Sequence, residues 1–332
     1  MKFRQFLLSR VFSWAITILI GVTFIFFIPR MFPSDPVENM IGQITARAGQ
    51  MDPVELELLR KNLRTQFGLD GSLIQQYFDF LWRGLLHFDF GPSLGSFPTP
   101  VNDIIGRNLP YTMVLSLSGT IVAWIFGNAI GLLAGFRKNA RSSKILESIA
   151  ICIYPIPYFI VALVFQIVFA FVLGWFPLQS NIVTNQGFGA FISSYTRGSF
   201  LPFMGLRLVR MGGQHSSMKS LASTTAEEDF VLFARYRGLS EKTIGISYVL
   251  RNSILTQITA LAMSLGGAFS GSIMTEIIFT YPGVGQLIQG AILGSDYNMI
   301  LGCITISIVA VSTATLIVDL IYPFIDPRIR YA

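Results

Sequence analysis

The chain has 332 residues, of which 52% are hydrophobic and only 13% are charged. A soluble protein carries about a quarter charged residues, so this composition argues against a soluble enzyme. The net charge of +6 includes no Lys/Arg cluster typical of a nucleic-acid-binding arm. Five runs without Asp, Glu, Lys or Arg are long enough, or nearly so, to cross a membrane as helices: residues 11–29, 108–136, 148–196, 252–275 and 297–318.

The first apolar run predicts a retained membrane span within residues 1–33. Lys2, Arg4 and Arg10 precede it, as basic residues precede the apolar core of a secretory signal. However, the run is long, and Pro29-Arg30-Met31 follows it instead of a small-residue cleavage site.

Residues 34–107 form the next segment, which holds nine acidic and six basic residues. Because basic residues collect in cytoplasmic loops, this balance places the segment outside the cytoplasm. Its stretch from residue 53 to 86 has apolar residues at helical spacing, broken by Gly68 and Gly71. We expect two amphipathic helices there that form a small outer helical cap.

Residues 108–332 are expected to form the membrane core with spans two to six. A third span is predicted from about Ile145 to Trp175. The region from 207 to 251 holds seven basic residues and is expected in the cytoplasm, so the chain must cross once more before it. Residues 200–222 are the best candidate, although Arg207 and Arg210 would each cost about 2.5–3.5 kcal/mol at the centre of a lone helix.

Such a polar fourth span is tolerable only if its charged side faces protein or water. The alternative for residues 200–222 is a segment in the membrane plane followed by a re-entrant loop. If residues 200–222 cross the membrane as the fourth span, the chain crosses six times. The sequence therefore predicts an all-α polytopic membrane protein with six transmembrane helices and both termini in the cytoplasm.

The apolar run 252–275, which is the expected fifth span, is rich in small residues. These allow close helix packing, and they also leave space for a solute; both interpretations stay open. The candidates for lining a solute path are Ser264, Gly267, Ser270 and Met274.

Sites for nucleotide, metal or catalysis are missing from the sequence. There is no G-x-x-x-x-G-K-[ST] phosphate loop, no G-x-S-x-G nucleophile elbow and no H-E-x-x-H zinc motif. Cys152, Cys303, His87 and His215 are far apart, which argues against a disulfide framework or a shared metal site. We therefore expect no enzyme activity, no cofactor and no metal in this chain.

An unusually charged stretch, residues 226–238, lies in the expected cytoplasmic loop 223–245. Thr224 or Thr225 with the acid three residues later makes a capping box, and Gly238 is suited to end a helix. The pattern predicts a helix of about a dozen residues that is marginal alone in water. Either it rests on the protein's own spans, or it docks into a groove of a partner.

The same stretch resembles the cytoplasmic EAA-type loop of ABC importer permeases, specifically the first-subunit type of the oligopeptide/dipeptide/nickel permease family. The resemblance covers nearly the whole chain and is weakest over residues 177–226. Further stretches that resemble the family are FGLDGSLIQQYFDFLWRGLLHFDFGPSL, PVNDIIGRNLPYTMVLSL, TEIIFTYPGVGQLIQGAILGSDY and VDLIYPFIDPRIRY.

The resemblance implies a multi-pass subunit of a bacterial or archaeal cytoplasmic (inner) membrane. Its implied partners are a second homologous permease subunit, two cytoplasmic ATP-binding subunits that carry ATP and Mg, an extracytoplasmic solute-binding protein and membrane lipid. The expected cargo is an oligopeptide or dipeptide; alternatives are short oligosaccharides or nickel, and, in a different class, a proton-driven secondary transporter. The implied coupling residues are Glu228, Asp229, Phe230, Val231, Ala234, Arg235, Gly238 and Leu239.

Overall fold

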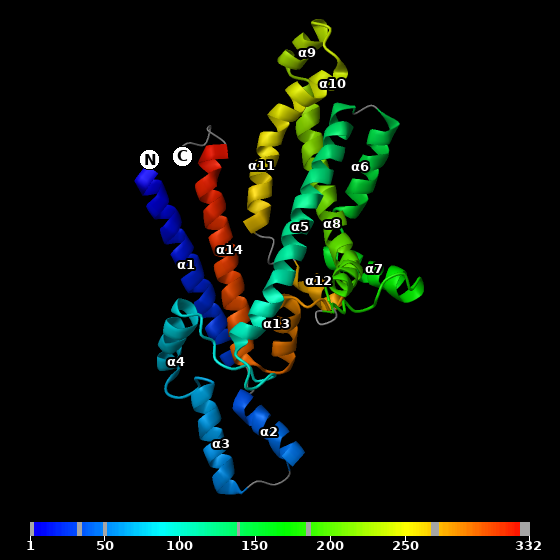
Figure 1. Cartoon of the computed structure of the whole chain (residues 1–332). Coiled ribbons are helices and arrows are strands. Elements are labelled where there is room, and N and C mark those ends of the chain that lie inside the picture. Colours follow the sequence, from blue (N-terminus) through cyan, green and yellow to red (C-terminus); the bar gives the residue numbers. More distant parts are fainter. Residues whose placement is uncertain are drawn as a thin grey trace. The chain divides into compact units, whose positions relative to one another are not determined.

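The computed structural model describes residues 3–31, 35–48, 52–137, 140–183, 187–266 and 272–325. These residues form helices joined by short connections, and no β-strand occurs among them (Figure 1). The chain divides into two compact units: residues 1–11, 113–281 and 313–332 form the first, and residues 12–112 and 282–312 form the second.

The helices before the expected membrane core are α1 (Phe3–Arg30), α2 (Pro36–Ala48), α3 (Pro53–Gln66), α4 (Leu73–Phe80) and the π-helical segment η1 (Leu81–Leu86). The next ones are α5 (Val101–Phe136), α6 (Arg141–Ile153), α7 (Tyr158–Phe165), η2 (Gln166–Val172) and α8 (Phe188–Ala226). The last ones are α9 (Asp229–Tyr236), α10 (Glu241–Thr243), η3 (Ile244–Leu250), α11 (Arg251–Gly266), α12 (Ile273–Ile278), α13 (Val284–Leu293) and α14 (Tyr297–Ile325).

Within the described part of the chain, α1, α5 and α14 are long and apolar enough to cross a membrane. The bent pair of α6 with α7–η2 makes a fourth span if it is counted as one. The remaining two of the six expected spans correspond to α8, which is long but polar, and to α11, which has 16 residues. The six-span topology and the cytoplasmic placement of the termini therefore stay predictions.

The third expected span is not one straight helix. The axis bends by 97° between α6 and α7, whereas the sequence analysis expected one crossing from Ile145 to Trp175. Pro155 and Pro157 occupy the break. A proline has no backbone N–H to donate and its ring clashes with the preceding turn, so two prolines in three residues end the first helix.

The polar fourth segment is one continuous helix. α8 has 39 residues and is about 58 Å long at 1.5 Å per residue. The alternative of an in-plane segment followed by a re-entrant loop over residues 200–222 is therefore wrong. Both arginines lie on protein rather than in open surroundings: Arg207 is 9% exposed, and the half-buried Arg210 donates a hydrogen bond to Thr120 of α5.

Three glycines of α5 allow α8 to approach very closely (Figure 1). Gly127, Gly131 and Gly135 recur every fourth residue and therefore share one face of α5. A Cβ atom added at Gly131 would lie 2.6 Å from the carbonyl oxygen of His215 in α8. This G-x-x-x-G-x-x-x-G pattern, which is typical of close helix contacts in membranes, is visible in the sequence and was not among the predicted features.

The expected outer cap belongs to the second unit. α3 and α4–η1 are the two helices predicted there, and Gly68 and Gly71 between them both have positive φ. An additional helix, α2, precedes them. α2 and α3 enclose a small apolar core made of Val37, Ile41, Leu63 and Phe67.

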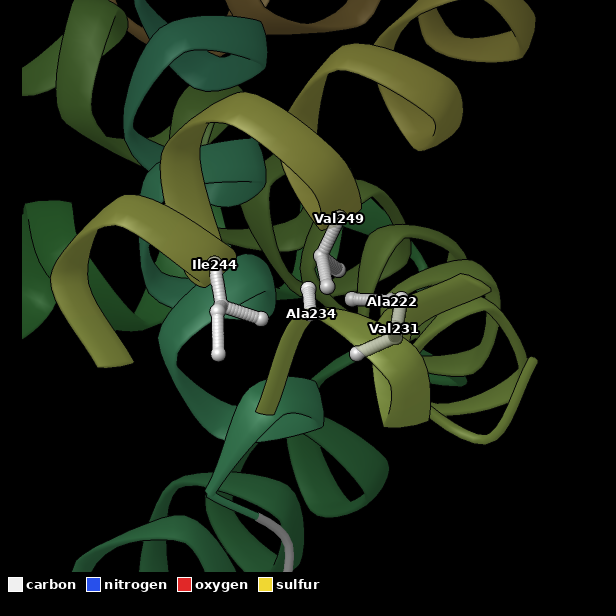
Figure 2. Close-up of a cluster of buried hydrophobic side chains, with 5 residues drawn as sticks. All are labelled: Ala222, Val231, Ala234, Ile244 and Val249. Carbon is white, nitrogen blue, oxygen red and sulfur yellow. The ribbon is translucent and has the colours of Figure 1, made fainter. Parts of the chain in front are cut away.

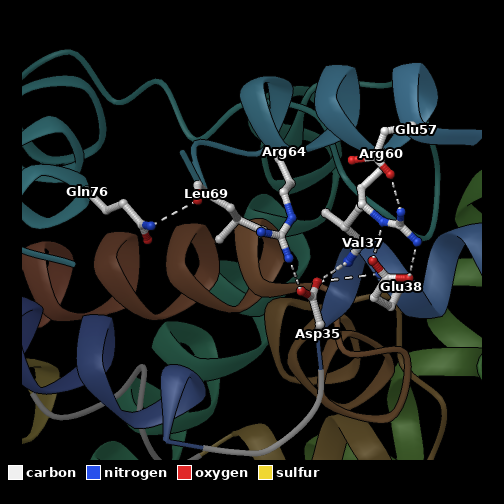
Figure 3. Close-up of polar contacts among 8 residues, drawn as sticks. All are labelled: Asp35, Val37, Glu38, Glu57, Arg60, Arg64, Leu69 and Gln76. Atoms are coloured by element: carbon white, nitrogen blue, oxygen red, sulfur yellow. Dashed lines mark hydrogen bonds and ion pairs between the residues drawn. The ribbon is translucent and has the colours of Figure 1, made fainter. Parts of the chain in front are cut away.

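Ion pairs join α2 to α3 around this core (Figure 3). Arg60 donates from Nε to Glu38 over 2.6 Å, and Arg64 donates to Asp35 over 2.7 Å. Within α3, Arg60 also donates from Nη1 to Glu57 over 2.5 Å. The hydrogen bond from Arg60 lowers the pKa of Glu38 below its ordinary value. Because these pairs are largely exposed, they orient the two helices more than they stabilise them.

The helix α4 packs on α1. The hydroxyls of Tyr77 and Thr23 lie 2.7 Å apart, and the Tyr77 ring meets the ring of Phe26 edge to face. The residues Ile74, Phe78 and Trp82 are well exposed. This part of the expected cap is thus attached to the first span rather than separate from it.

The close contact of α5 with α8 predicts a sharp difference between two glycines of the same helix. Gly131→Ala should destabilise the protein by about 1–3 kcal/mol, because the added methyl group overlaps the backbone of α8. Gly106→Ala is the matched control, since nothing lies within 4 Å of its added Cβ and alanine favours helix by about 1 kcal/mol. Thermal unfolding of the purified protein in detergent measures both; equal melting temperatures would contradict this packing.

Candidate functional site

The charged stretch forms the short helix α9 directly after α8 (Figure 1). It has eight residues, fewer than the expected dozen, and Glu228 is its N-cap without a side-chain hydrogen bond. The expected capping boxes are wrong, because α8 continues through Ala226 and absorbs both threonines into its last turn. The hydroxyl of Thr225 there lies 3.2 Å from that of Ser253.

Gly238 ends α9, as the sequence predicted. Its φ of +73° is left-handed, a conformation that glycine adopts without a steric penalty. Its N–H donates to the carbonyl of Arg235 over 2.9 Å, and the N–H of Leu239 donates to that of Ala234 over 3.3 Å. These two bonds define a Schellman motif, in which the residue after the glycine also packs back on the helix.

One face of α9 is fixed to the chain's own helices. Val231 and Ala234 are buried in a cluster with Ala222 of α8 and with Ile244 and Val249 of η3 (Figure 2). Both residues belong to the implied coupling set. Their side chains face this chain's own helices, because a helix this short is not stable alone and they anchor it.

The opposite side carries an exposed aromatic face made of Phe230, Phe233 and Tyr236. Their exposed fractions are 41%, 63% and 87%. Spacing by three residues places them on neighbouring positions of the helix surface. The implied coupling set includes Phe230 but neither Phe233 nor Tyr236, although their spacing by three residues is visible in the sequence.

The charged members of the coupling set lie at the two ends of α9. Glu228 and Asp229 are exposed at the N-terminus, where negative charge is favoured by the helix dipole. Arg235 is in the last turn, and its Nε lies 3.4 Å from a carboxylate oxygen of Glu241. The set therefore combines a fixed aliphatic face with a free aromatic and acidic surface.

The candidates for a solute path fall in different places. Ser264 is a half-buried residue of α11 whose hydroxyl donates to the carbonyl of Ala260 over 2.7 Å. Met274 is a half-exposed residue of α12. Gly267 and Ser270 lie outside the residues that the structure describes. Ser264 lines a cavity of about 450 Å³ together with Thr120, Ala123, Tyr154, Arg210, Gly213 and Gln214.

Truncation of a side chain should lower the stability of α9 on its buried face and have little effect on its exposed face. Val231→Ala removes methyl groups from a fully buried site and should lower the local stability of α9 by about 1.5–3 kcal/mol. Tyr236→Ala, at a site that is 87% exposed, should change it by less than about 0.5 kcal/mol. Hydrogen exchange of the α9 amides measures both variants. Equal protection in the two would show that the cluster does not anchor the helix.

Comparison with known protein families gives two matches that together cover most of the chain. Residues 127–331 match the family described as binding-protein-dependent transport system inner membrane component. Residues 3–116 match the N-terminal membrane component of binding-protein-dependent transport systems.

Curated relatives match over nearly their whole length. The chain is 30% identical to the oligopeptide transport system permease protein AppB of Bacillus subtilis, over 96% of both chains. It is 29% identical to the oligopeptide permease protein OppB of Haemophilus influenzae, over 98% of this chain and 99% of that one. It is 28% identical to the dipeptide permease protein DppB of Bacillus subtilis, over 98% of both. The chain therefore belongs to the family of binding-protein-dependent inner membrane components, the permeases of ABC importers.

Proposed function

We propose that this permease forms part of the path by which an ATP-driven importer carries oligopeptides or dipeptides across the membrane. The observation that supports the cargo most directly is the similarity, over nearly full length, to three permeases named for oligopeptides and dipeptides. In this proposal the chain pairs with a second permease subunit, receives solute from an extracytoplasmic binding protein and docks on two ATP-binding subunits.

The surface that suits ATPase docking is the exposed aromatic face of α9. Aromatic side chains are frequent anchors of protein interfaces, and this face is free while the other face is buried against α8 and η3. A partner that moves when it binds ATP would pull on α9, and the buried cluster would pass the displacement to the helices beside it. Rocking of the spans then opens the path to alternate sides.

Two alternatives, an oligosaccharide cargo and a proton-driven secondary transporter, have less support. The relatives described above are named for peptides, so the oligosaccharide alternative gains nothing from them. A proton-driven secondary transporter would need neither ATPase subunits nor a binding protein, whereas this family is defined by dependence on a binding protein.

The docking proposal predicts that Phe233→Ala and Phe230→Ala weaken association with the ATPase subunits by about tenfold or more, a loss of at least 1.4 kcal/mol. Both residues are partly exposed, so the permease itself should remain folded. Phe188→Ala is the matched control, because Phe188 is 81% exposed at the opposite end of α8. Co-purification with the ATPase subunits and ATP-driven peptide uptake in vesicles measure the effect.

If both variants of α9 assemble and transport like the control, the aromatic face is not the docking surface. Loss of assembly in all three variants would instead show general damage to the permease.

The proposed topology places residues 34–107 outside and α9 inside. Single cysteines introduced by Ser72→Cys and Ser240→Cys, both at exposed sites, should react with a membrane-impermeant thiol reagent from opposite sides. Cys152→Ser supplies the background, since Cys152 is exposed whereas Cys303 is buried. Labelling of both cysteines from one side would refute the arrangement.

A further inference from the structure

The cavity beside Arg210 gathers polar groups from four helices of the first unit. Thr120 comes from α5, Tyr154 follows α6, Arg210 and Gln214 belong to α8, and Ser264 belongs to α11. Its volume of about 450 Å³ is in the range of small-molecule sites. Ser264, one of the candidates for lining a solute path, therefore shares a polar hollow with residues of α5 and α8.

The charge in this cavity is not balanced. Among the described residues that line it, Arg210 is the only charged one and none is acidic. The guanidinium has five N–H donors, and its one hydrogen bond within the described residues goes to the hydroxyl of Thr120. Lys219, farther along α8, is different because it forms an ion pair with Glu147.

The nearby Arg207 provides an internal contrast. It is 9% exposed, its guanidinium lies over the ring of Phe203, and it does not line the cavity. Two of its guanidinium nitrogens, Nε and Nη2, are buried without a hydrogen-bond partner among the described residues. Arg210 differs from Arg207 because it lines a hollow large enough for a ligand.

A second polar group in the lining lacks a partner. The side-chain oxygen of Gln214 is buried with no hydrogen-bond donor among the described residues, and a buried unsatisfied acceptor is unfavourable. Rotation of this amide towards the cavity would let it accept an N–H from a ligand. A peptide end presents both a carboxylate, which suits a guanidinium, and an adjacent amide N–H.

We propose that this cavity is a transient binding site for the carboxylate end of a passing peptide, with Arg210 as the anion-binding residue. The inference rests on the proposed peptide cargo and names the chemistry that the permease recognises. A neutral sugar would leave the Arg210 charge unbalanced and would find a single aromatic ring, that of Tyr154, in the part of the lining that the structure describes.

Thiol protection in the assembled transporter tests this site. Ser264→Cys in the Cys152→Ser background places a thiol on the cavity wall, in vesicles of phosphatidylcholine. Millimolar trialanine should slow its modification at least threefold, whereas trialanine amide, which lacks the carboxylate, should not. Arg210→Gln should abolish the protection, and Arg207→Gln should preserve it. Equal protection by the two peptides, or protection that survives Arg210→Gln, would overturn the proposal.

A lipid headgroup is the other source of an anion. If phosphatidylglycerol in the vesicles slows the labelling without peptide and trialanine adds nothing, the site binds lipid and the proposal is wrong.

Uptake measurements separate this inference from the proposed function. If the wild-type transporter imports no peptide at all, the peptide cargo is wrong. If it imports trialanine, Arg210→Gln should raise the KM for trialanine at least fivefold, with a smaller change in Arg210→Lys, which keeps the charge. An unchanged KM in Arg210→Gln would reject the carboxylate site while leaving the cargo intact. Should the glutamine variant fail to assemble, the comparison of trialanine with trialanine amide in the Ser264→Cys transporter decides the case.

Discussion

The close contact between α5 and α8 is the constraint on which the first unit depends. α8 carries more polar groups than a lone membrane helix tolerates, including Arg207, Arg210 and Lys219. Three glycines of α5 bring the two backbones so near that even one added methyl group at Gly131 would meet a carbonyl of α8. Protein, rather than lipid, can then surround the charged positions. The polar hollow and the anchor of α9 both depend on where this contact holds α8.

The anchor of α9 follows from the size of the helix. Eight residues form too few hydrogen bonds to offset the entropy of ordering the chain in water, so the helix needs neighbours. Val231 and Ala234 supply the contact with α8 and η3, and the Schellman motif at Gly238 turns the chain back towards η3. A helix held on one side in this way presents its other side in a fixed orientation. Such a surface loses little freedom when a partner binds it.

The sequence predicted features that depend on local chemistry. The all-helical class, the break between α3 and α4 and the stop at Gly238 follow from apolar runs and glycines. Features set by packing were harder to predict. The capping boxes failed because α8 runs on through Thr225, and nothing local distinguishes a threonine in a last helical turn from one that caps the next helix. Likewise, helical spacing shows that α9 has two faces but does not reveal which face is buried.

Other features of the structure that were not predicted have a visible signal in the sequence. Pro155 and Pro157 lie within an uncharged run, and hydropathy alone treats that run as one span although two prolines break a helix. The glycine repeat of α5 and the spacing of the aromatic residues of α9 can also be seen directly in the sequence. Small residues predict a solute path along the run 252–275, whereas hydropathy registers Arg210 of α8 only as an unfavourable charge.

Arg210 and α9 are linked by the continuity of α8. Sixteen residues separate Arg210 from the end of α8 at Ala226, which corresponds to about 24 Å of helix. A helix transmits a tilt along its length because each turn is hydrogen-bonded to the next. A small rotation imposed through the buried cluster at one end would therefore change the position of the guanidinium relative to Thr120. The proposed anion site need not open by itself, since its geometry is tied to the helix that leads to the proposed docking surface.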